Sequence, residues 1–227
     1  MIKWKQKLLS LTLAAVLSVG LLTVGAGAAF TDQNQITQTA AVAECVRLKI
    51  INGFPDGSFR PKDRLTREQM SKMICIIGNK GRLPAQPSRS SFKDVPLKRW
   101  SAPYIEFCAK KQIVNGVGGG RFSPQGDLNY IQAGKMLLVL MQYDPNREGM
   151  TGSGWSYNTT LLAEQHNLFY RILQPNILET MTREDAAQMI YNGLNANMVG
   201  YASNGKVYEK DATIGSYYLG LPAVTTE

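Results

Sequence analysis

Two arginines stand at the expected first position of a helix, where their side chains could bind an anion. Arg67 and Arg183 each follow a threonine that is expected to cap the helix, and each precedes a glutamate. The helix macrodipole disfavours a cation at this position by roughly 0.3–1 kcal/mol, so helix stability does not explain the arginines. A guanidinium group and the N–H groups of a helix N-terminus can together hold a carboxylate or a phosphate. The alternative is a surface ion pair with Glu68 or Glu184, which would contribute little to stability.

The arginines are linked to a sequence that repeats along the chain. Asn52–Pro61 (NGFPDGSFRP) and Asn115–Pro124 (NGVGGGRFSP) align without a gap, and each leads into an expected helix start. A third, weaker copy ends in Met181–Asp185, and the segment before it contains no glycine. A repeat of this length predicts an array of similar units, so function is expected in or between units rather than in one catalytic pocket.

Each copy is expected to contain two helices joined by a turn-rich connector. In the second helix, apolar residues recur at i, i+3, i+4 and i+7, which predicts one buried stripe. The stripes are Met70, Met73, Ile74 and Ile77 in copy one; Ala133, Met136, Leu137 and Leu140 in copy two; and Ala186, Met189, Ile190 and Gly193 in copy three. The first helices are expected over about 36–48, 100–112 and 155–167. The sequence therefore predicts a mainly α fold of three tandem helix–loop–helix repeats.

The starts of the second helices carry capping sequences. Thr66 with Gln69, and Asn129 with Gln132, predict capping boxes, and Thr182 begins an approximate version. The connectors are rich in glycine and asparagine, which favour tight turns, and their phenylalanines, Phe59 and Phe122, are expected to fold back as apolar plugs.

Residues 1–28 are typical of a secretory signal. Three lysines precede an apolar run from Leu8 to Val24, and Ala26-Gly27-Ala28 supplies a cleavage site. The alternative is an uncleaved membrane anchor, although the run is marginal for a span of about 20 apolar residues. Cleavage removes three lysines and no acidic residue, so the formal net charge falls from +8 to +5. This excess suits an anionic polymer outside the cell, and no basic and aromatic run points to nucleic acid.

Catalysis, a metal site and a disulfide framework are not predicted. Cys45 and Cys108 occupy the same position in successive copies and are expected as small buried helix residues, and Cys75 lies in an apolar run. His166, the only histidine, lies among leucines, which favours a structural role. The segment Ser90–Lys93 fits S-x-x-K, a short pattern that is frequent by chance. We therefore expect a protein that is not an enzyme and has no cofactor.

These features together resemble the S-layer homology domain. Its motifs are present as Phe92-Lys93-Asp94-Val95 followed by Trp100, as Ile113–Gly116, as Gly120-x-Phe122-x-Pro124, and as helix starts of the Thr66-Arg67-Glu68-Gln69 type. The third copy is supported by Trp155 and by Thr182–Ala187. The resemblance covers nearly the whole mature chain and implies three prongs in a pseudo-threefold helical bundle.

The resemblance also predicts the domain boundaries. Repeat 1 is expected over residues 29–82, repeat 2 over residues 89–148, and repeat 3, with its degenerate connector, over residues 149–198. Residues 199–227 form a C-terminal tail, in which 206–209 and 216–219 are expected as short strands or as a strap over the bundle. The alternative is that the tail is the start of a truncated cargo region.

Proteins with such domains are held non-covalently to the bacterial cell envelope, so the resemblance implies secretion to the cell wall or cell surface. The implied partner is a secondary cell-wall polysaccharide, a glycan linked to peptidoglycan, whose pyruvate ketals bind in grooves between prongs. The implied ligand residues are two arginines, two connector glycines and two tryptophans: Arg67, Arg183, Gly57, Gly120, Trp100 and Trp155. The arginines would bind the carboxylate, the glycines would admit the sugar to backbone N–H groups, and the tryptophans could stack on it. Buried anchoring is the expected main role of both tryptophans.

The chain departs from the family pattern at three places. Tyr130 stands where the family has arginine, Thr37 stands where repeat 2 has Trp100, and repeat 3 lacks the glycine connector. If every groove needs its own arginine, at most two grooves are competent. The alternative function is a structural subunit of a surface layer or envelope assembly, which would contact other envelope proteins without strong glycan binding.

Overall fold

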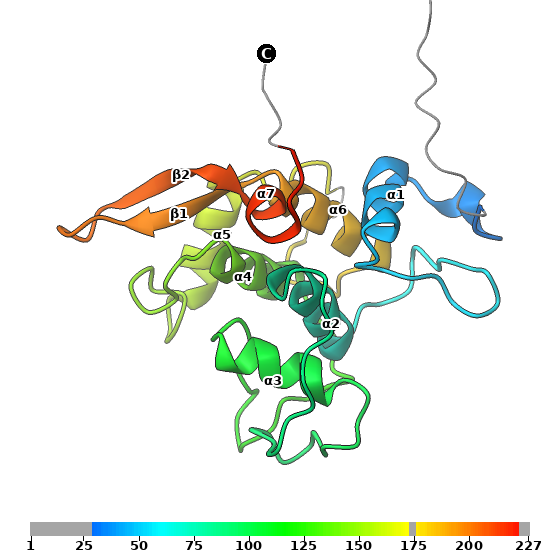
Figure 1. Ribbon diagram of the computed structural model, residues 1–227, viewed down its shortest axis with the longest axis horizontal. Coiled ribbons are helices and arrows are strands. Elements are labelled where there is room, and N and C mark those ends of the chain that lie inside the picture. Colours follow the sequence, from blue (N-terminus) through cyan, green and yellow to red (C-terminus); the bar gives the residue numbers. More distant parts are fainter. Residues whose placement is uncertain (1–28, 173–175, 223–227) are drawn as a thin grey trace, which may run out of the picture.

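The computed structural model describes residues 29–172 and 176–222, which are mainly helical (Figure 1). The predicted secretory signal lies outside the described residues. The helices are a 3₁₀ helix (Gln33–Gln35), α1 (Thr39–Arg47), α2 (Arg67–Gly78), α3 (Ala102–Lys110), α4 (Tyr130–Leu140), α5 (Trp155–Gln165), α6 (Arg183–Leu194) and α7 (Ile214–Leu219). Strands β1 (Asn197–Tyr201) and β2 (Val207–Thr213) lie between α6 and α7. The prediction of a mainly α fold is confirmed.

The three second helices, α2, α4 and α6, supply the centre of the core. Every residue of the three predicted stripes is buried. The capping boxes of Thr66 and Asn129 have both of their hydrogen bonds, and the side chain of Thr182 accepts from the backbone of Asp185. Caps therefore fix where each helix starts, and the stripes fix which face turns inward.

Each first helix packs on a second helix from a different repeat. α3 lies against α2, α5 against α4, and α1 against α6, so the last of the three second helices packs on the first helix of the chain (Figure 1). The buried thiols repeat this pairing: Cys108 donates to the carbonyl oxygen of Ser71 at 3.4 Å, and Cys45 donates to that of Ala187 at 3.5 Å. Cys45 and Cys108 are small buried helix residues, as predicted.

The residues just before the three helix caps form a closed ring of backbone hydrogen bonds. Leu65 donates to Met181 at 2.9 Å, Met181 donates to Leu128 at 2.8 Å, and Leu128 donates to Leu65 at 3.1 Å. All three side chains are buried. This ring has the cyclic order that a pseudo-threefold bundle requires at its centre, whereas the symmetry of the bundle as a whole stays a prediction.

Connector 1 (residues 48–66) and connector 2 (residues 111–129) are fastened by the same motif. Asp32 accepts backbone hydrogen bonds from Phe59 and Arg60, and Asp94 accepts them from Phe122 and its neighbour in connector 2. Both connector phenylalanines are fully buried, which confirms the predicted apolar plugs. Repeat 1 therefore has a counterpart of the Phe92–Val95 motif, which sequence reasoning missed.

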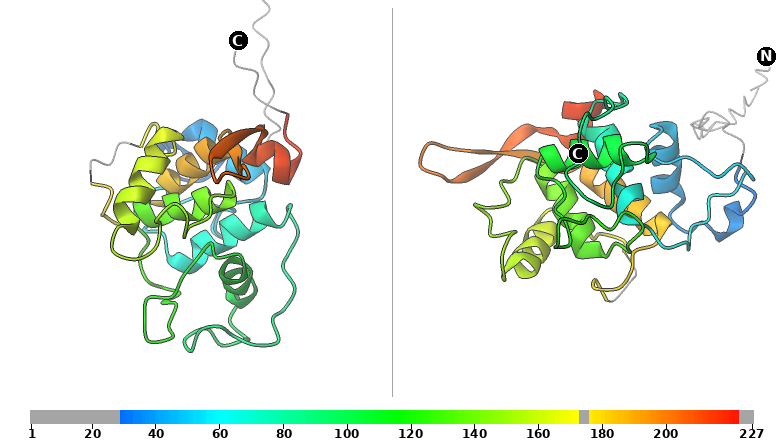
Figure 2. Two further views of the ribbon diagram at one scale, coloured as in Figure 1. Left: turned by 90° about the vertical axis from the view of Figure 1, so that its left-hand side faces the viewer. Right: turned by 90° about the horizontal axis from the view of Figure 1, so that it is seen from below.

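The C-terminal tail combines a hairpin with a helix. β1 and β2 pair antiparallel and project from the helices, as Figure 1 and the right-hand view of Figure 2 show. The tail is hydrogen-bonded to the end of α4: Val199 donates its backbone N–H to the carbonyl oxygen of Met141 at 2.9 Å, and the Tyr218 hydroxyl donates to that of Leu140 at 3.2 Å. Residues 216–219 belong to α7, so a strand there is wrong. Within the described ranges, no helix combines the length and apolar character that crossing a bilayer requires.

Candidate anion-binding pocket

Arg67 reaches from the start of α2 to connector 2. Its Nε donates to the carbonyl oxygen of Phe122 at 2.9 Å, and a terminal nitrogen donates to that of Asn115 at 2.8 Å. The guanidinium group also stacks on the Phe122 ring, with Cζ 4.4 Å from the ring centroid. A guanidinium group has five N–H donors, and these two carbonyl bonds hold it in one orientation while leaving further donors for a ligand.

The sequence suggested that an anion binds the guanidinium group and the N–H groups of the helix start together, but these N–H groups are already hydrogen-bonded. The backbone N–H of Arg67 donates to Gly126 at 3.0 Å, and that of Glu68 donates to Pro124 at 2.9 Å. The third N–H of the helix is capped by Thr66. The first two residues of α6 donate to connector 1 in the same way. The expectation that an anion binds these N–H groups is therefore wrong, because connector carbonyls already occupy them.

The alternative role, a local ion pair with the following glutamate, is also wrong. Glu68 bonds to Arg99 at 2.8 and 2.9 Å and to the Ser101 hydroxyl at 2.5 Å. Glu184 accepts from the backbone and hydroxyl of Thr37 at 2.9 and 3.0 Å. Both glutamates thus hold a first helix of another repeat, which leaves the arginines for another role.

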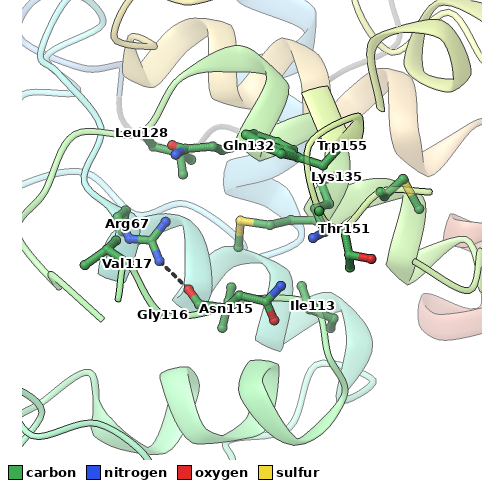
Figure 3. Close-up of a pocket in the computed structure, with 14 residues that line it drawn as sticks. Arg67, Ile113, Asn115, Gly116, Val117, Leu128, Gln132, Lys135, Thr151 and Trp155 are labelled. Atoms are coloured by element: carbon green, nitrogen blue, oxygen red, sulfur yellow. Dashed lines mark hydrogen bonds between the residues drawn. The ribbon is translucent and has the colours of Figure 1, made fainter. Parts of the chain in front are cut away.

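A pocket of about 330 Å³ opens beside Arg67 (Figure 3). Figure 3 shows Arg67 on one side and Lys135, Thr151 and Trp155 on the opposite side. The other lining residues are Ile113, Val114, Asn115, Gly116, Val117, Leu128, Gln132, Met136, Met150 and Gly152. The wall comes from Arg67, from residues 113–136 and from residues 150–155, and it contains two cations and no acidic side chain.

Both cations of the pocket are partly removed from water. Burial lowers the pKa of Lys135, and burial lowers the pKa of Arg67 although the Asp94 charge acts in the opposite direction. Arginine stays charged at neutral pH despite such a shift. Lys135 Nζ lies 5.9 Å from the centroid of the Trp155 ring. An anion that enters the pocket would therefore stabilise two poorly hydrated positive charges beside an aromatic face.

Lys135 was missed by sequence reasoning, because nothing in the sequence distinguishes it. It is the repeat 2 counterpart of Lys72, at the same position of the second helix. Both are flanked by stripe residues and resemble ordinary surface lysines, so only the structure shows that Lys135 faces Trp155.

Arg183 makes the same two hydrogen bonds on connector 1. Its Nε donates to Phe59 at 2.9 Å, and a terminal nitrogen donates to Asn52 at 3.1 Å. Its guanidinium carbon lies 4.8 Å from the Phe54 ring and 5.0 Å from the Phe59 ring. Only 5 % of Arg183 is exposed. The two arginines therefore bond to different connectors: Arg67 lies beside a pocket, whereas Arg183 is covered.

Of the predicted glycines and tryptophans, only Trp155 lines the pocket at Arg67. Gly57 and Gly120 have φ of +79° and +72°, which turns of this kind require, and neither lines the pocket at Arg67. Trp100 is 52 % exposed and stacks loosely on Tyr104, so a buried anchoring role for it is wrong. Trp155 is partly buried in the pocket wall. Among the described residues, no group of three or more His, Cys, Asp or Glu side chains could hold a metal ion.

The chain is similar in sequence to proteins named for the bacterial cell surface, surface layer or cell wall. A cell surface protein of Thermoanaerobacter kivui is 29 % identical over 200 residues, which cover 86 % of this chain and 25 % of that protein. A surface layer protein of Brevibacillus choshinensis is 22 % identical over 227 residues, or 95 % of this chain and 20 % of that protein. A cell wall amidase of Bacillus anthracis, whose name calls it uncharacterized, is 30 % identical over 91 residues, or 40 % of this chain and 16 % of that protein.

The chain thus spans a quarter or less of the length of these relatives. The S-layer homology domain model matches residues 29–71 and 91–133, which belong to repeats 1 and 2. Repeat 3 lies outside these matches and stays a prediction. The S-layer homology domain is therefore found twice in this chain, which is similar to proteins of the bacterial cell surface and cell wall.

Proposed function

We propose that the protein anchors to the bacterial cell wall by binding an anionic, pyruvylated secondary cell-wall polysaccharide, without catalysis. The single observation that carries this proposal is the pocket at Arg67, where two cations and an indole meet and no carboxylate lines the wall. The two S-layer homology matches, and relatives named for the cell surface and surface layer, support the location.

A pyruvate ketal fits the chemistry of this pocket. It presents a carboxylate on a sugar ring, and the planar guanidinium of Arg67 can meet that carboxylate with parallel hydrogen bonds. Each charge-assisted bond would contribute roughly 1.5–3 kcal/mol. Lys135 would add a second positive charge, and the Trp155 ring would cover an apolar face of the sugar. The side chains of Asn115 and Gln132 would select among its hydroxyl groups.

The similarity to an amidase does not extend the proposal to catalysis. It covers only 16 % of that protein, which fits an anchoring segment shared by proteins of different function. The only histidine, His166, bonds to the Tyr143 hydroxyl at 2.7 Å, and burial lowers its pKa. This environment suits the structural role that the sequence favours.

A second candidate function is a structural subunit of a surface layer. The similarity to a surface layer protein over 95 % of this chain favours it. In that case, the purified protein would assemble with rising concentration in the absence of glycan. Binding of monomers to isolated polymer would instead support anchoring.

The test compares two lysines that occupy the same helix position. Lys135→Met removes the pocket charge and retains apolar length, whereas Lys72→Met makes the same change on α2, outside the pocket. Each protein is mixed with purified cell walls that retain or lack their pyruvyl groups, and the bound fraction is measured by sedimentation. We expect wild type and Lys72→Met to sediment with pyruvylated walls, and Lys135→Met to remain in solution.

Arg67→Ala provides a second variant, with thermal unfolding measured to show that it is folded. Equal sedimentation of wild type with both kinds of wall would contradict recognition of the pyruvyl group. Undiminished sedimentation of folded Arg67→Ala and of Lys135→Met would contradict the pocket as the site.

A further inference from the structure

We propose that a second pocket, beside α3, binds an extended and acidic peptide segment of a partner protein. This pocket has a volume of about 640 Å³, which is in the usual range of ligand pockets, roughly 300–1,000 Å³. It shares only residues 114–116 with the pocket at Arg67, and Arg67 does not line it. The proposal therefore goes beyond glycan binding to a different site and a different class of ligand.

Three segments of the chain form the wall of this peptide pocket. The linker between α2 and α3 (residues 79–92) contributes residues 87–89, 91 and 92. The last two turns of α3 contribute Glu106, Ala109 and Lys110, and connector 2 contributes residues 114–116. All of these residues lie within one stretch of the chain, so the pocket is enclosed by a single prong and does not lie between repeats.

The backbone of the linker is extended and has no hydrogen-bond partner. Pro84 and Pro87 fix their own φ angles and favour extended conformations in the residues before them. Within the described ranges, no backbone N–H or C=O group of residues 83–89 takes part in a hydrogen bond, and the N–H groups of residues 114–116 are unpaired as well. An extended peptide can pair its own backbone with such groups.

The charged side chains of the peptide pocket favour an acidic ligand. Arg89 and Lys110 are exposed, and neither side chain has an ion pair or hydrogen bond in the part of the chain that the structure describes. Glu106 is the one carboxylate in the wall, and it accepts from the backbone N–H and the hydroxyl of Ser91 at 2.8 and 2.7 Å. Two cations are therefore left without a counter-ion.

The surroundings of the peptide pocket are also basic. Residues 80–121 contain nine lysines and arginines and two acidic residues, whereas the rest of the chain from Ala29 contains thirteen and fifteen. α3 and the loops on both sides of it carry this charge and lie at one end of the molecule (Figure 1). A positive potential of this kind attracts an acidic partner and repels a basic one.

Apolar side chains in the same wall suggest the pattern of the peptide. Phe92 and Val114 contribute apolar surface next to the two cations. Successive side chains of an extended peptide point to opposite sides. A segment in which acidic and apolar residues alternate therefore matches the wall.

The test measures binding of a model peptide by fluorescence anisotropy at low salt. The probe is a fluorescein-labelled, amidated octapeptide of alternating glutamate and valine, and the control peptide has lysine in place of glutamate. Wild type is expected to bind the glutamate peptide and not the lysine peptide. Failure of wild type to bind the glutamate peptide would overturn the proposal. Displacement of the probe by an equal concentration of oligogalacturonate with as many carboxylates would show that the site recognises charge alone, which also overturns it.

A double variant tests the two cations. Arg89→Gln combined with Lys110→Gln should fold as wild type does, because both side chains are exposed and unpaired. Its affinity for the glutamate peptide should be about tenfold lower at low salt, since each partly exposed ion pair contributes a modest factor. Lys111→Gln is the matched control, because this neighbour of Lys110 does not line the pocket, and it should bind as wild type does. Equal affinity of the double variant and wild type would place the peptide elsewhere.

Amide hydrogen exchange locates the bound peptide on the backbone. The glutamate peptide should slow exchange at residues 83–89 and 114–116, and leave residues 52 and 53, the connector 1 counterparts of 115 and 116, unchanged. Unaltered exchange at both segments would contradict backbone pairing. Lys135→Met, which alters the pocket at Arg67, should bind the peptide as wild type does, so the proposed glycan function and this inference can fail separately.

Discussion

The hydroxyl group of Tyr130 donates a hydrogen bond of 2.7 Å to the carboxylate of Asp185, joining the start of α4 to the start of α6. Tyr130 occupies the position at which α2 and α6 begin with arginine, and only 1 % of it is exposed. Burial and then the hydrogen bond to Asp185 raise its pKa, so the hydroxyl remains a donor. The same carboxylate accepts from Thr182 at 2.8 Å. At the start of α4, the tyrosine that replaces arginine therefore makes a hydrogen bond within the fold.

Removal of this hydroxyl should weaken the fold. Tyr130→Phe leaves Asp185 with its contacts to Thr182 but without the buried donor, so we expect the free energy of unfolding to fall by about 1.5 kcal/mol. Urea denaturation measures this change. Tyr157→Phe is the matched control, because Tyr157 is 72 % exposed on α5, and it should leave stability unchanged. Equal stability of both variants would show that the hydrogen bond is not needed.

Glu68 should link α2 to the start of α3 more strongly than Tyr130 links α4 to α6. It is 5 % exposed and holds Arg99 and Ser101 at the start of α3. Because the Arg99 side chain is still 24 % exposed, Glu68→Ala should cost roughly 2–3 kcal/mol of unfolding free energy, less than a fully buried pair. The control is Glu44→Ala, which breaks an exposed pair with Arg47 and should cost about 0.5 kcal/mol or less. Similar losses of unfolding free energy for the two variants would show that the buried Glu68 contributes no more stability than an exposed ion pair.

Acid should destabilise the two connectors by protonating Asp94 and Asp32, the carboxylates that accept their backbone hydrogen bonds. Burial acts to raise the pKa of Asp94, but backbone hydrogen bonds from Phe122 and Ser123 outweigh it, and the pKa is lowered. The same balance lowers the pKa of Asp32. A carboxyl group with a lowered folded-state pKa stabilises the fold above its unfolded pKa of about 3.9, and this contribution is lost as pH falls through the folded value.

The variant Asp94→Asn should therefore be less stable than wild type at pH 7, and the difference should shrink towards pH 3. Urea denaturation at a series of pH values measures it. Asp211→Asn, an exposed aspartate on β2, controls for general charge effects. A difference that stays constant with pH would mean that Asp94 acts through packing and not through its charge.

Local patterns predicted the helices well because they depend on neighbouring residues. The stripes from Met70 and Met136 and the cap at Thr66 all lie within one helix or its first turn. The pairing of α1 with α6 joins residues far apart in the chain, and no local pattern encodes it. The same holds for Lys135 opposite Trp155, since the two residues meet only after repeats 2 and 3 have packed.

The tail shows a case in which a local signal was present and unused. The tyrosines of residues 216–219 have a high strand propensity, and the sequence leaves open a short strand or a strap over the bundle. Thr213 and Ser216 form a capping box, and Gly220 ends α7 with φ of +66°. These cap signals specify a short helix and outweigh propensity. A threonine three residues before a polar side chain, with glycine after the next turn, predicts such a helix.

Trp155 should report ligand binding directly. It lies in the pocket wall with Lys135 Nζ 5.9 Å from its ring, so a sugar that stacks there changes the polarity around the indole. In the protein beginning at Ala29, a methyl hexoside that bears a pyruvate ketal should shift the wavelength of tryptophan emission, and Trp155→Phe should abolish the shift. Trp100→Phe is the matched control, since Trp100 is outside the pocket and its loss should leave the shift intact. A shift that vanishes with Trp100 and persists without Trp155 would place the ligand at the surface beside α3 instead.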